Sequence, residues 1–426
     1  MSGCLAMWIS VAIFMATYVF IILEKFDRTI VACLGAFLMI LLNIINQGFA
    51  IREIDFNTLG LLIGMMILVM ITKRTGIFEY IAIKLVKIAK GNPVKIIVLL
   101  SFATGVMSAL LDNVTTILLI IPITLSIADD LNINPIPFMI TEVFASNVGG
   151  TATLIGDPPN IIIGSAVGLT FSDFIVNNGL FVLITLLVVI GLFTIKYRKE
   201  LRTTDELRAK IIQKNENELI KDKKLLRKCL IVLLFVLIAF LFHGELGYES
   251  ATIAMFGAIV LLLVSKIEVE EILGEVEWKT IFFFIGLFIL VGGLKSTGAI
   301  DKLAEFVLDL TGSNLVLTSM SVLWVSAVAS AFIDNIPFVT TMIPLIIHMG
   351  AISEMNLVPL WWALSLGACL GGNGTIVGAS ANVIAVGISE KQGYKITFGK
   401  FFKEAFPVML LTIVMSTIYL FIKHLI

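Results

Sequence analysis

The sequence predicts an all-α integral membrane protein made of two inverted repeats, each with about five spanning helices, a re-entrant hairpin and a broken helix. Three observations lead to this prediction. The 426-residue chain is 58% hydrophobic and only 14% charged, which is too apolar for a soluble domain of this size. Its apolar runs have a helical period rather than the alternation of barrel strands. Finally, long stretches of the first half recur 222 residues later.

The internal repeat is most evident where Ser108–Asn113 (SALLDN) recurs as Ser330–Asn335 (SAFIDN). No gap is needed anywhere from Phe56 to Asn160. Further identical pairs are Gly64 and Gly286, Lys73 and Lys295, Gly76 and Gly298, Gly149 and Gly371, Gly150 and Gly372, Thr153 and Thr375, Gly156 and Gly378, and Asn160 and Asn382. A duplicated half with interrupted apolar segments is typical of secondary transporters, whose binding site forms where the repeats meet.

Eight apolar runs are close to the ~20 residues that a spanning helix needs, or reach that length with uncharged neighbours. They are Leu5–Leu23, Ile30–Ile45, Leu59–Ile71, Phe174–Ile195, Leu230–Phe242, Thr252–Val264, Thr280–Leu294 and Phe406–Ile422. The first run has neither a basic leading region nor a small-x-small cleavage site. We therefore expect it to be a retained helix rather than a signal peptide.

A polar stretch divides the chain into residues 1–195, an N-terminal membrane repeat, and residues 229–426, a C-terminal inverted repeat. The connecting residues 196–228 hold 12 of the 30 Lys and Arg residues, so the positive-inside rule predicts a cytoplasmic linker. Its Asp205–Lys228 part has the pattern of an amphipathic helix.

The two repeats are expected to have opposite orientations. Counting spans outward from the linker places the basic stretch Lys73–Lys95 in the cytoplasm, together with Lys25 and Arg28. The stretch Lys295–Ser313, which is equivalent in the repeat, then falls outside, and it is rich in acids. Equivalent segments with opposite charge bias on opposite sides indicate inversion.

Two segments are too polar at their centres to cross the membrane simply. Lys95–Ala128 has two apolar arms around a tip that contains Asp112, Asn113, Thr115 and Thr116, and Asn314–His348 has two arms around Asp334 and Asn335. We interpret both as re-entrant hairpins, the first entering from the cytoplasm and the second from outside. The alternative is that each arm crosses the membrane once.

Each hairpin is followed by a helix that glycines interrupt. The first contains Asn147, Gly149, Gly150, Thr151, Thr153, Gly156, Asp157 and Asn160, and the second contains Gly371, Gly372, Asn373, Thr375, Gly378 and Asn382. Gly weakens a helix and Pro158-Pro159 cannot continue one, so the backbone should open here. An opening would free carbonyl groups for a cation and N–H groups for an anion. The alternative is glycine kinks that only allow close packing.

Acidic residues within the membrane are the strongest functional candidates, because each costs on the order of ~3 kcal/mol by insertion scales. Asp112 and Asp334 occupy equivalent hairpin tips, where they could couple transport to protons or cations, cap the second arm, or do both. Asp157 has Ala379 as its counterpart, so it has either a specific role or a capping role. Glu142 also lies within a span, opposite Leu364 in the repeat.

At these motifs the chain resembles the ArsB/NhaD/P-protein permeases (arsenical pump, pink-eyed dilution) of the ion transporter superfamily. The resemblance rests on the Asp112-to-Pro122 hairpin and on the run from Glu142 to Asn160. It implies an elevator-type carrier, in which hairpins and broken helices slide against the other helices. Its members handle arsenite or antimonite, exchange Na⁺ for H⁺, or carry dicarboxylates. The dicarboxylate carriers have Ser-Asn-Thr at both tips, and their absence here counts against a multivalent carboxylate.

The sequence thus predicts a proton-coupled secondary transporter of a small inorganic ion in the plasma membrane, in which Asp112 and Asp334 carry the coupling. Arsenite or antimonite export is the leading hypothesis. The alternatives are a Na⁺/H⁺ antiporter of the NhaD kind, a dicarboxylate or citrate-type carrier, an ion channel, and the membrane subunit of a pump driven by a soluble ATPase. No cofactor, metal, nucleic acid or enzymatic chemistry is expected, and a homodimer is left open. The predicted substrate and ion site comprises Asp112, Asn113, Thr115, Thr116, Asn147, Gly149, Gly150, Thr151, Thr153, Gly156, Asp157, Asn160, Asp334, Asn335, Gly371, Gly372, Asn373, Thr375, Gly378 and Asn382.

Overall fold

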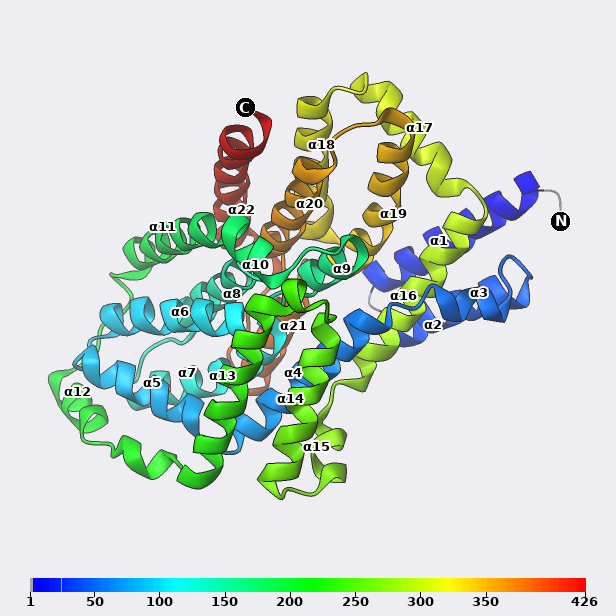
Figure 1. Cartoon of the computed structure of the whole chain (residues 1–426). Coiled ribbons are helices and arrows are strands. Elements are labelled where there is room, and N and C mark those ends of the chain that lie inside the picture. Colours follow the sequence, from blue (N-terminus) through cyan, green and yellow to red (C-terminus); the bar gives the residue numbers. More distant parts are fainter. Residues whose placement is uncertain (1–2, 24) are drawn as a thin grey trace.

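The computed structural model describes residues 3–23 and 25–426, and every regular element within them is a helix (Figure 1). The first repeat contains α1 (Gly3–Leu23), α2 (Arg28–Leu41), α3 (Gln47–Arg52), α4 (Phe56–Lys73), α5 (Ile77–Ile88), α6 (Pro93–Leu110), α7 (Asn113–Asp130), α8 (Ile136–Gly150), α9 (Pro158–Val167), α10 (Phe171–Phe174) and α11 (Leu180–Tyr197). After α12 (Asp205–Ile212), the second repeat contains α13 (Lys223–Leu246), α14 (Ser250–Ser265), α15 (Val269–Glu275), α16 (Trp278–Ser296), α17 (Ala299–Thr311), α18 (Leu315–Phe332), α19 (Asn335–Ser353), α20 (Val358–Gly371), α21 (Ser380–Lys391) and α22 (Phe398–Leu420). Ten helices in the described part are long and apolar enough to span a membrane, and α2 and α14 are shorter apolar helices.

The repeat predicted from the sequence is present in the helix boundaries. α2 and α14 begin at Arg28 and Ser250, 222 residues apart, and the next seven equivalent helices begin at the same offset, down to α9 and α21. Equivalent caps set these starts. The side chains of Asn92 and Asn314 accept backbone N–H bonds at the starts of α6 and α18, as N-cap residues do.

Two ion pairs at opposite ends of α4 and α16 show that the repeats are inverted. Arg74, at the end of α4, pairs with Glu275 just before α16 at 2.5 Å. Lys295, at the end of α16, pairs with Glu53 just before α4 at 3.2 Å. Glu53 and Glu275 are repeat counterparts. The equivalent helices therefore run antiparallel, as they do when a two-fold axis in the membrane plane relates the halves.

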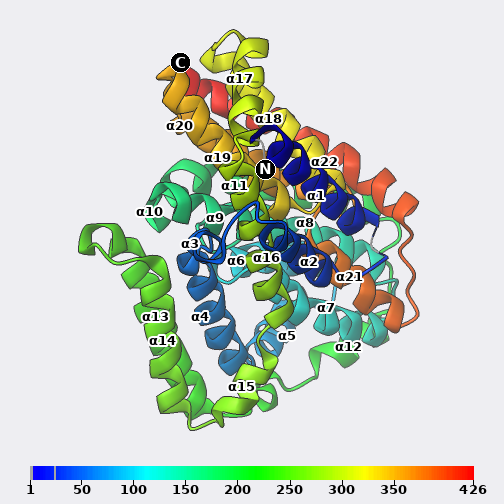
Figure 2. The same cartoon turned by 90° about the vertical axis from the view of Figure 1, so that its right-hand side faces the viewer.

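Six helices, which we call the frame helices, form two groups: α13 and α14 lie beside α4, and α1 and α2 lie beside α16 (Figures 1 and 2). Their backbones approach closely at small residues. A Cβ on Gly64 would lie 2.7 Å from the carbonyl carbon of Ala254, and a Cβ on Gly286 would lie 2.8 Å from that of Ala32. Both contacts join one repeat to the other, and the repeat offset relates them. Small residues allow such close packing of helices in membranes.

The two hairpins with the two broken helices, α6–α9 and α18–α21, form what we call the core helices. Both ends of the first hairpin meet the linker: Asp130, at the end of α7, pairs with Lys214, and a Cβ on Gly91, before α6, would lie 3.0 Å from Arg208. The arms therefore begin and end on the same side of the molecule. Both a re-entrant hairpin and a pair of crossings would do so, and re-entry stays a prediction.

The linker differs from the single amphipathic helix expected over Asp205–Lys228. α12 ends at Ile212, a 3₁₀ turn covers Glu216–Leu219, and α13 begins at Lys223, capped by Asp222. Tertiary bonds to the turn between α4 and α5, and to α5 itself, replace helical bonds in the gap. The Lys221 N–H donates to the carbonyl oxygen of Thr75 at 3.0 Å. Lys87 pairs with Glu216 and, as the main cause, lowers the pKa of that carboxyl.

Candidate ion and substrate site

The hairpin tips place two carboxylates at the centre of the molecule. Asp112 Oδ1 accepts the backbone N–H of Thr115 at 2.7 Å, and Asp334 Oδ1 accepts that of Ile336 at 3.1 Å. Each aspartate is thus the N-cap of its second arm, and this half of the expectation is confirmed. Both residues are buried, with 6% and 5% exposure.

The hairpins hold the openings of the broken helices through matched threonines. Thr153 donates through Oγ1 to the Ala109 carbonyl at 2.6 Å, and Thr375 donates in the same way to the Ala331 carbonyl at 2.5 Å. The threonine hydroxyls are therefore engaged with backbone. These bonds fix each broken helix to the inner end of the first arm of its own hairpin.

The openings free carbonyl groups, and matched asparagines occupy several of them. Asn160 Nδ2 donates to the Thr153 carbonyl at 2.9 Å, and Asn382 Nδ2 donates to those of Gly372 and Thr375 at 2.8 Å. Asn160 also lies within hydrogen-bond distance of the Gly150 and Thr151 carbonyls. Buried carbonyl groups need donors, so the freed carbonyls serve the fold rather than standing open.

The glycines press against backbone. A Cβ on Gly149 would lie 2.0 Å from the Gly105 carbonyl oxygen, and one on Gly371 would lie 2.5 Å from Ala327 Cα. The remaining site glycines face one another in pairs across the openings. In the first repeat, a Cβ on Gly150 would lie 2.3 Å from the Gly156 carbonyl oxygen, and one on Gly156 would lie 2.5 Å from that of Gly150. In the second repeat, a Cβ on Gly372 would lie 2.9 Å from the Gly378 carbonyl oxygen, and one on Gly378 would lie 2.6 Å from that of Gly372. These positions admit only glycine because main chain approaches main chain.

The two broken helices meet through side chains that cross between repeats. Asn147 Nδ2 donates to Asn373 Oδ1 at 3.0 Å and to Asn382 Oδ1 at 2.9 Å. The Cys369 thiol donates to Asn160 Oδ1 at 3.4 Å. Since Asn147 and Cys369 are counterparts, as are Asn160 and Asn382, the two-fold axis relates these cross-links. The seam between the repeats therefore runs through the predicted site.

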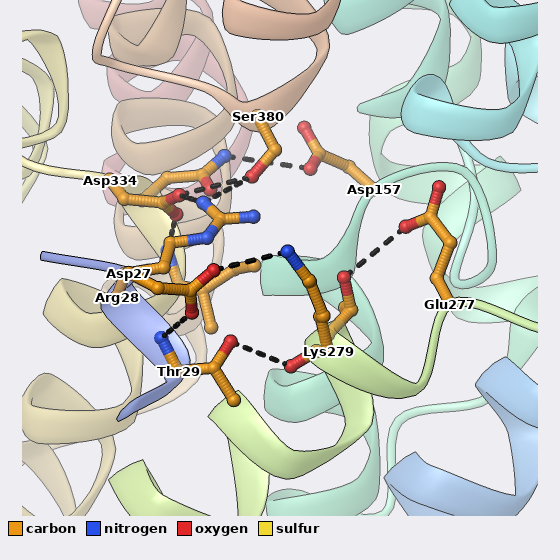
Figure 3. A network of polar contacts seen from close by, with 11 residues as sticks. Asp27, Arg28, Thr29, Asp157, Glu277, Lys279, Asp334 and Ser380 are labelled. Atoms are coloured by element: carbon orange, nitrogen blue, oxygen red, sulfur yellow. Dashed lines mark hydrogen bonds and ion pairs between the residues drawn. The ribbon is translucent and has the colours of Figure 1, made fainter. Parts of the chain in front are cut away.

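Asp157 lies at this seam and is fully buried (Figure 3). It occupies the N-cap position of α9 but makes no side-chain capping bond. Its Oδ1 instead accepts from Asn113 Nδ2 at 3.1 Å and from Asn335 Nδ2 at 3.5 Å. Of the two readings that the sequence left open, the cap is wrong, and one carboxylate joins the tips of both hairpins.

Several buried polar atoms of the hairpin tips and broken helices lack a hydrogen-bond partner among the described residues. They are Asp157 Oδ2, Asn113 Oδ1, Thr116 Oγ1 and Asn373 Nδ2, all of them buried. An unpaired buried polar atom is costly, and its presence calls for an explanation such as a bound ion or proton. Three of the four are oxygen atoms, which suit a hard cation.

Three further residues that the sequence singled out bond to groups other than Asp157. Thr115 contributes its backbone N–H to the Asp112 cap, and Thr151 Oγ1 donates to the Asn147 carbonyl within its own helix at 2.8 Å. Glu142 is fully buried, and Thr124 Oγ1 lies 2.8 and 2.9 Å from its two oxygens. Glu142 therefore has one hydroxyl partner and no ion pair among the described residues.

One charged residue of the site escaped the sequence analysis. Arg28, expected to be a cytoplasmic flanking charge, donates to Asp334 Oδ2 at 2.5 Å and to Ser380 Oγ at 2.8 Å (Figure 3). The signal was available, because Arg28 begins a repeated helix whose counterpart begins with Ser250. Arg28 thus has no charged counterpart in the other repeat.

Next to Arg28, the start of α16 brings further charges near the hairpin tips. Lys279 pairs with Asp27 at 3.2 Å, and Glu277 lies close by (Figure 3). Burial raises the pKa of Glu277, and the negative charge of Asp112 raises it further. The tips thus lie near those ends of α2 and α16 that the sequence places toward the cytoplasm.

The inverted repeats and the polar seam between them define a class: a multi-pass membrane protein built as a secondary transporter. A sequence model described as "CitMHS: Citrate transporter" matches residues 18–367. The chain belongs to this transporter family. The family description and the name of the first relatives both indicate a transporter.

Similar proteins cover nearly the whole chain. "Uncharacterized transporter Rv2684" of Mycobacterium tuberculosis is 42% identical over 422 residues, which cover 98% of both proteins. The "46 kDa membrane protein" of Mycobacterium leprae is 42% identical over 424 residues, 98% of this chain and 99% of that one. The human "P protein" is 35% identical over 504 residues, which span 98% of this chain and 60% of the P protein.

The fold has a solved counterpart in the Alcanivorax borkumensis YdaH transporter, described as having an unusual topology. The TM-score is 0.60 with 14% identity, covering 99% of this chain and 97% of the other. This likeness concerns the fold alone. Of the predicted resemblance, the relation to P proteins is confirmed, whereas the matching family model is that of citrate transporters and not of ArsB or NhaD.

Proposed function

We propose that this protein is a secondary-active, elevator-type carrier of the plasma membrane that couples a small inorganic substrate to a proton or sodium ion bound at Asp157. Arsenite or antimonite is the leading substrate. The observation that carries the proposal is the unpartnered, buried Asp157 Oδ2 at the seam of the two repeats. A carboxylate of this kind binds a proton directly or, with the free oxygens of Asn113 and Thr116, a cation.

The charges of the site favour this substrate class. Asp112, Asp157 and Asp334 bring three carboxyl groups to the centre, and Arg28 is the single cation paired with any of them among the described residues. A tricarboxylate would meet like charges here, and like charges brought together without water repel strongly. Arsenite is uncharged arsenous acid at neutral pH, and a neutral solute avoids that repulsion. Amide and hydroxyl groups line the seam and suit its hydroxyls.

Citrate is the second candidate, because the family model that matches the chain is described as a citrate transporter. For citrate to bind, bound cations or protons would have to neutralise the carboxylates first. A Na⁺/H⁺ antiporter, a third candidate, would use Asp157 alone and need no further substrate. A single set of measurements separates the three.

The experiment uses purified protein in liposomes with an internal pH indicator. We would impose a proton gradient and add Na⁺ or Li⁺, arsenite, or citrate in separate trials. Discharge of the gradient by arsenite supports the leading proposal, discharge by citrate the second, and discharge by Na⁺ alone the antiporter. Saturation and counterflow without ATP would support a carrier; a current linear in voltage, or a need for a soluble ATPase, would contradict it.

The proposed elevator motion can be tested directly. The inverted repeat predicts which contacts form when the core helices have moved to the opposite side of the membrane. In this structure Tyr18 Oη donates to the Pro337 carbonyl at 2.6 Å and lies 3.0 Å from Thr341 Oγ1, which joins α1 to the second hairpin. The repeat counterparts of Tyr18 and Thr341 are Phe240 and Leu119. Exchanging the roles of the repeats brings these two together when the core helices move to the other side.

Cysteine pairs would detect the two states. Mercury should cross-link Y18C with T341C in the state described here and F240C with L119C in the opposite state. A cation gradient should shift the balance between the two cross-links. Transport that continues while the second pair never cross-links would contradict the elevator mechanism.

A further inference from the structure

The second hairpin tip has the environment of a cation site, but a protein cation fills it. Asp334 Oδ2 accepts from Arg28 Nη1 at 2.5 Å and from Ser380 Oγ at 3.0 Å. Arg28 Nη1 also donates to Ser380 Oγ at 2.8 Å. One carboxylate oxygen and one hydroxyl oxygen therefore contact the guanidinium. These are the ligand types that a free sodium ion or a proton would use.

The first hairpin tip lacks both partners. Arg28 is replaced in the repeat by Ser250, and Ser380 is replaced by Pro158, which has no donor. Among the described residues, Asp112 makes no ion pair, and the charged groups on which it acts, Glu277 and Asp157, are themselves acids. Two tips that share the sequence Asp-Asn thus differ in electrostatics: one is neutralised by a fixed cation and the other is not.

The position of Arg28 makes the pair dependent on the state of the carrier. Arg28 is the first residue of the frame helix α2, whereas Asp334 and Ser380 belong to the core helices. The guanidinium lies over the Phe283 ring of α16, 5.0 Å from its centroid, so the frame holds it from two sides. Movement of the core relative to the frame separates Arg28 from Asp334.

The pair also lies beside open space. A cavity of about 190 Å³ is lined by Arg28, Asp334, Ile21, Phe26 and Val377, among others. The Arg28 side chain is 35% exposed and that of Asp334 is 6% exposed. A free cation therefore has room to reach Asp334 when Arg28 is absent.

We infer that Arg28 is a tethered cation that takes the place of a coupling ion at Asp334, so that this state binds one free cation fewer than it would without Arg28. The inference rests on the proposed function, because it assigns the ion stoichiometry of that same site. As the core moves away from α2, Asp334 loses Arg28, and on the return Arg28 displaces whatever cation Asp334 has taken up.

The test counts bound cations without a transported substrate. A cation that binds only the folded protein stabilises it in proportion to the logarithm of its concentration, and the limiting slope gives the number of sites. We would measure thermal unfolding of the purified full-length protein against Na⁺ and Li⁺ concentration at several pH values. R28S, which copies the repeat counterpart Ser250, should bind one more cation or proton than the wild type. The inference would be overturned if R28S and the wild type bound equal numbers of cations and protons, with Na⁺ and with Li⁺ alike.

Four variants make the result specific. R28S with D334N should return to the wild-type count, and R28K, which keeps the charge, should not gain a site. If R28S cannot be purified, R28Q removes the charge while keeping a donor and should show the same gain. K279S is the matched control, because Lys279 belongs to the same polar network as Arg28 (Figure 3) but pairs with Asp27 rather than with Asp334. The number of cations bound by K279S should equal that of the wild type.

Failure of the proposed function gives a different result. D157N should lower the cation count by one in both the native and the R28S background. A D157N protein with an unchanged count would contradict the Asp157 site, whereas the gain in R28S, and its loss with D334N, would still establish the role of Arg28.

Discussion

The two hairpins with their broken helices are built alike, but they are not used alike. Thr153 and Thr375 make the same bond to the equivalent backbone carbonyl of their hairpins, and Asn160 and Asn382 bind the equivalent freed carbonyls. These two pairs of positions, whose side chains hold the opened backbone, are therefore identical in both repeats. The reason is that each repeat must satisfy the same open backbone.

The positions that differ gather at the polar centre. The repeat counterpart of Asp157 is Ala379, that of Asn147 is Cys369, and that of Arg28 is Ser250. None of these three side chains is required by the backbone of its own repeat, and each contacts the other repeat. The comparison teaches that symmetry preserves the scaffold of the site, whereas departures from symmetry mark its chemistry.

The largest effect is expected at Asp157, whose repeat counterpart Ala379 carries no charge. D157N should reduce cation-coupled flux by at least about a hundredfold, roughly 2.7 kcal/mol, because an amide neither takes up a proton nor supplies a charge to a cation. The protein should still reach the membrane, since Asp157 makes no capping bond. Flux in proteoliposomes measures the loss, and A379S, at the equivalent position, serves as the control that keeps activity. Wild-type flux from D157N would remove Asp157 from the mechanism.

Next in size are alanine substitutions of the matched glycines. G149A places a methyl group 2.0 Å from a backbone oxygen, and G371A places one 2.5 Å from backbone Cα and O atoms of α18. Overpacking of this kind costs on the order of 1–3 kcal/mol or more, and we expect the larger loss at Gly149. Thermal unfolding in detergent measures it, with G191A as control, because a Cβ on Gly191 meets no atom within 4 Å. Unchanged stability of G149A would show that the two helices separate more readily than their packing suggests.

A smaller and symmetric effect is expected from the threonine pair. T153V and T375V keep the shape of the side chain but leave a buried carbonyl without its donor, at a cost of about 1–3 kcal/mol each. The two losses should agree closely, because both hydroxyls make the same bond. Unfolding curves of the two variants, measured side by side, provide the check. A large difference between them would mean that one threonine has a further role in the site.

The smallest effect is expected at the two ion pairs that report the inversion. E53Q and E275Q each remove one partner of a partly exposed pair, and exposed pairs contribute about 0–1 kcal/mol. Salt should screen the contributions, so the difference from wild type should shrink between low and high ionic strength. Stability measured at two salt concentrations tests this, and a loss that does not respond to salt would indicate that the side chains pack rather than pair.

The local features of this protein could be predicted from its sequence. Apolar runs, caps such as Asn92, the hairpin tips and the glycine breaks act through neighbours within a turn or two, so composition and spacing are sufficient to find them. The opposite charge bias of segments related by the repeat offset also predicted the orientation of each half. A local signal also misled once, because the charged pattern over Asp205–Lys228 predicts one helix, and contacts of the linker with α4 and α5 interrupt it.

The sequence by itself therefore determined the membrane class, the inverted repeat, and the polar residues of the hairpin tips and broken helices. Only the tertiary structure decided their partners: that Asp157 joins both hairpin tips rather than capping a helix, and that Arg28 neutralises Asp334. Arg28 and Asp334 are 306 residues apart in the chain. Charges at such separations meet only after two repeats have packed against each other, and one sequence carries no local trace of which pairs will form.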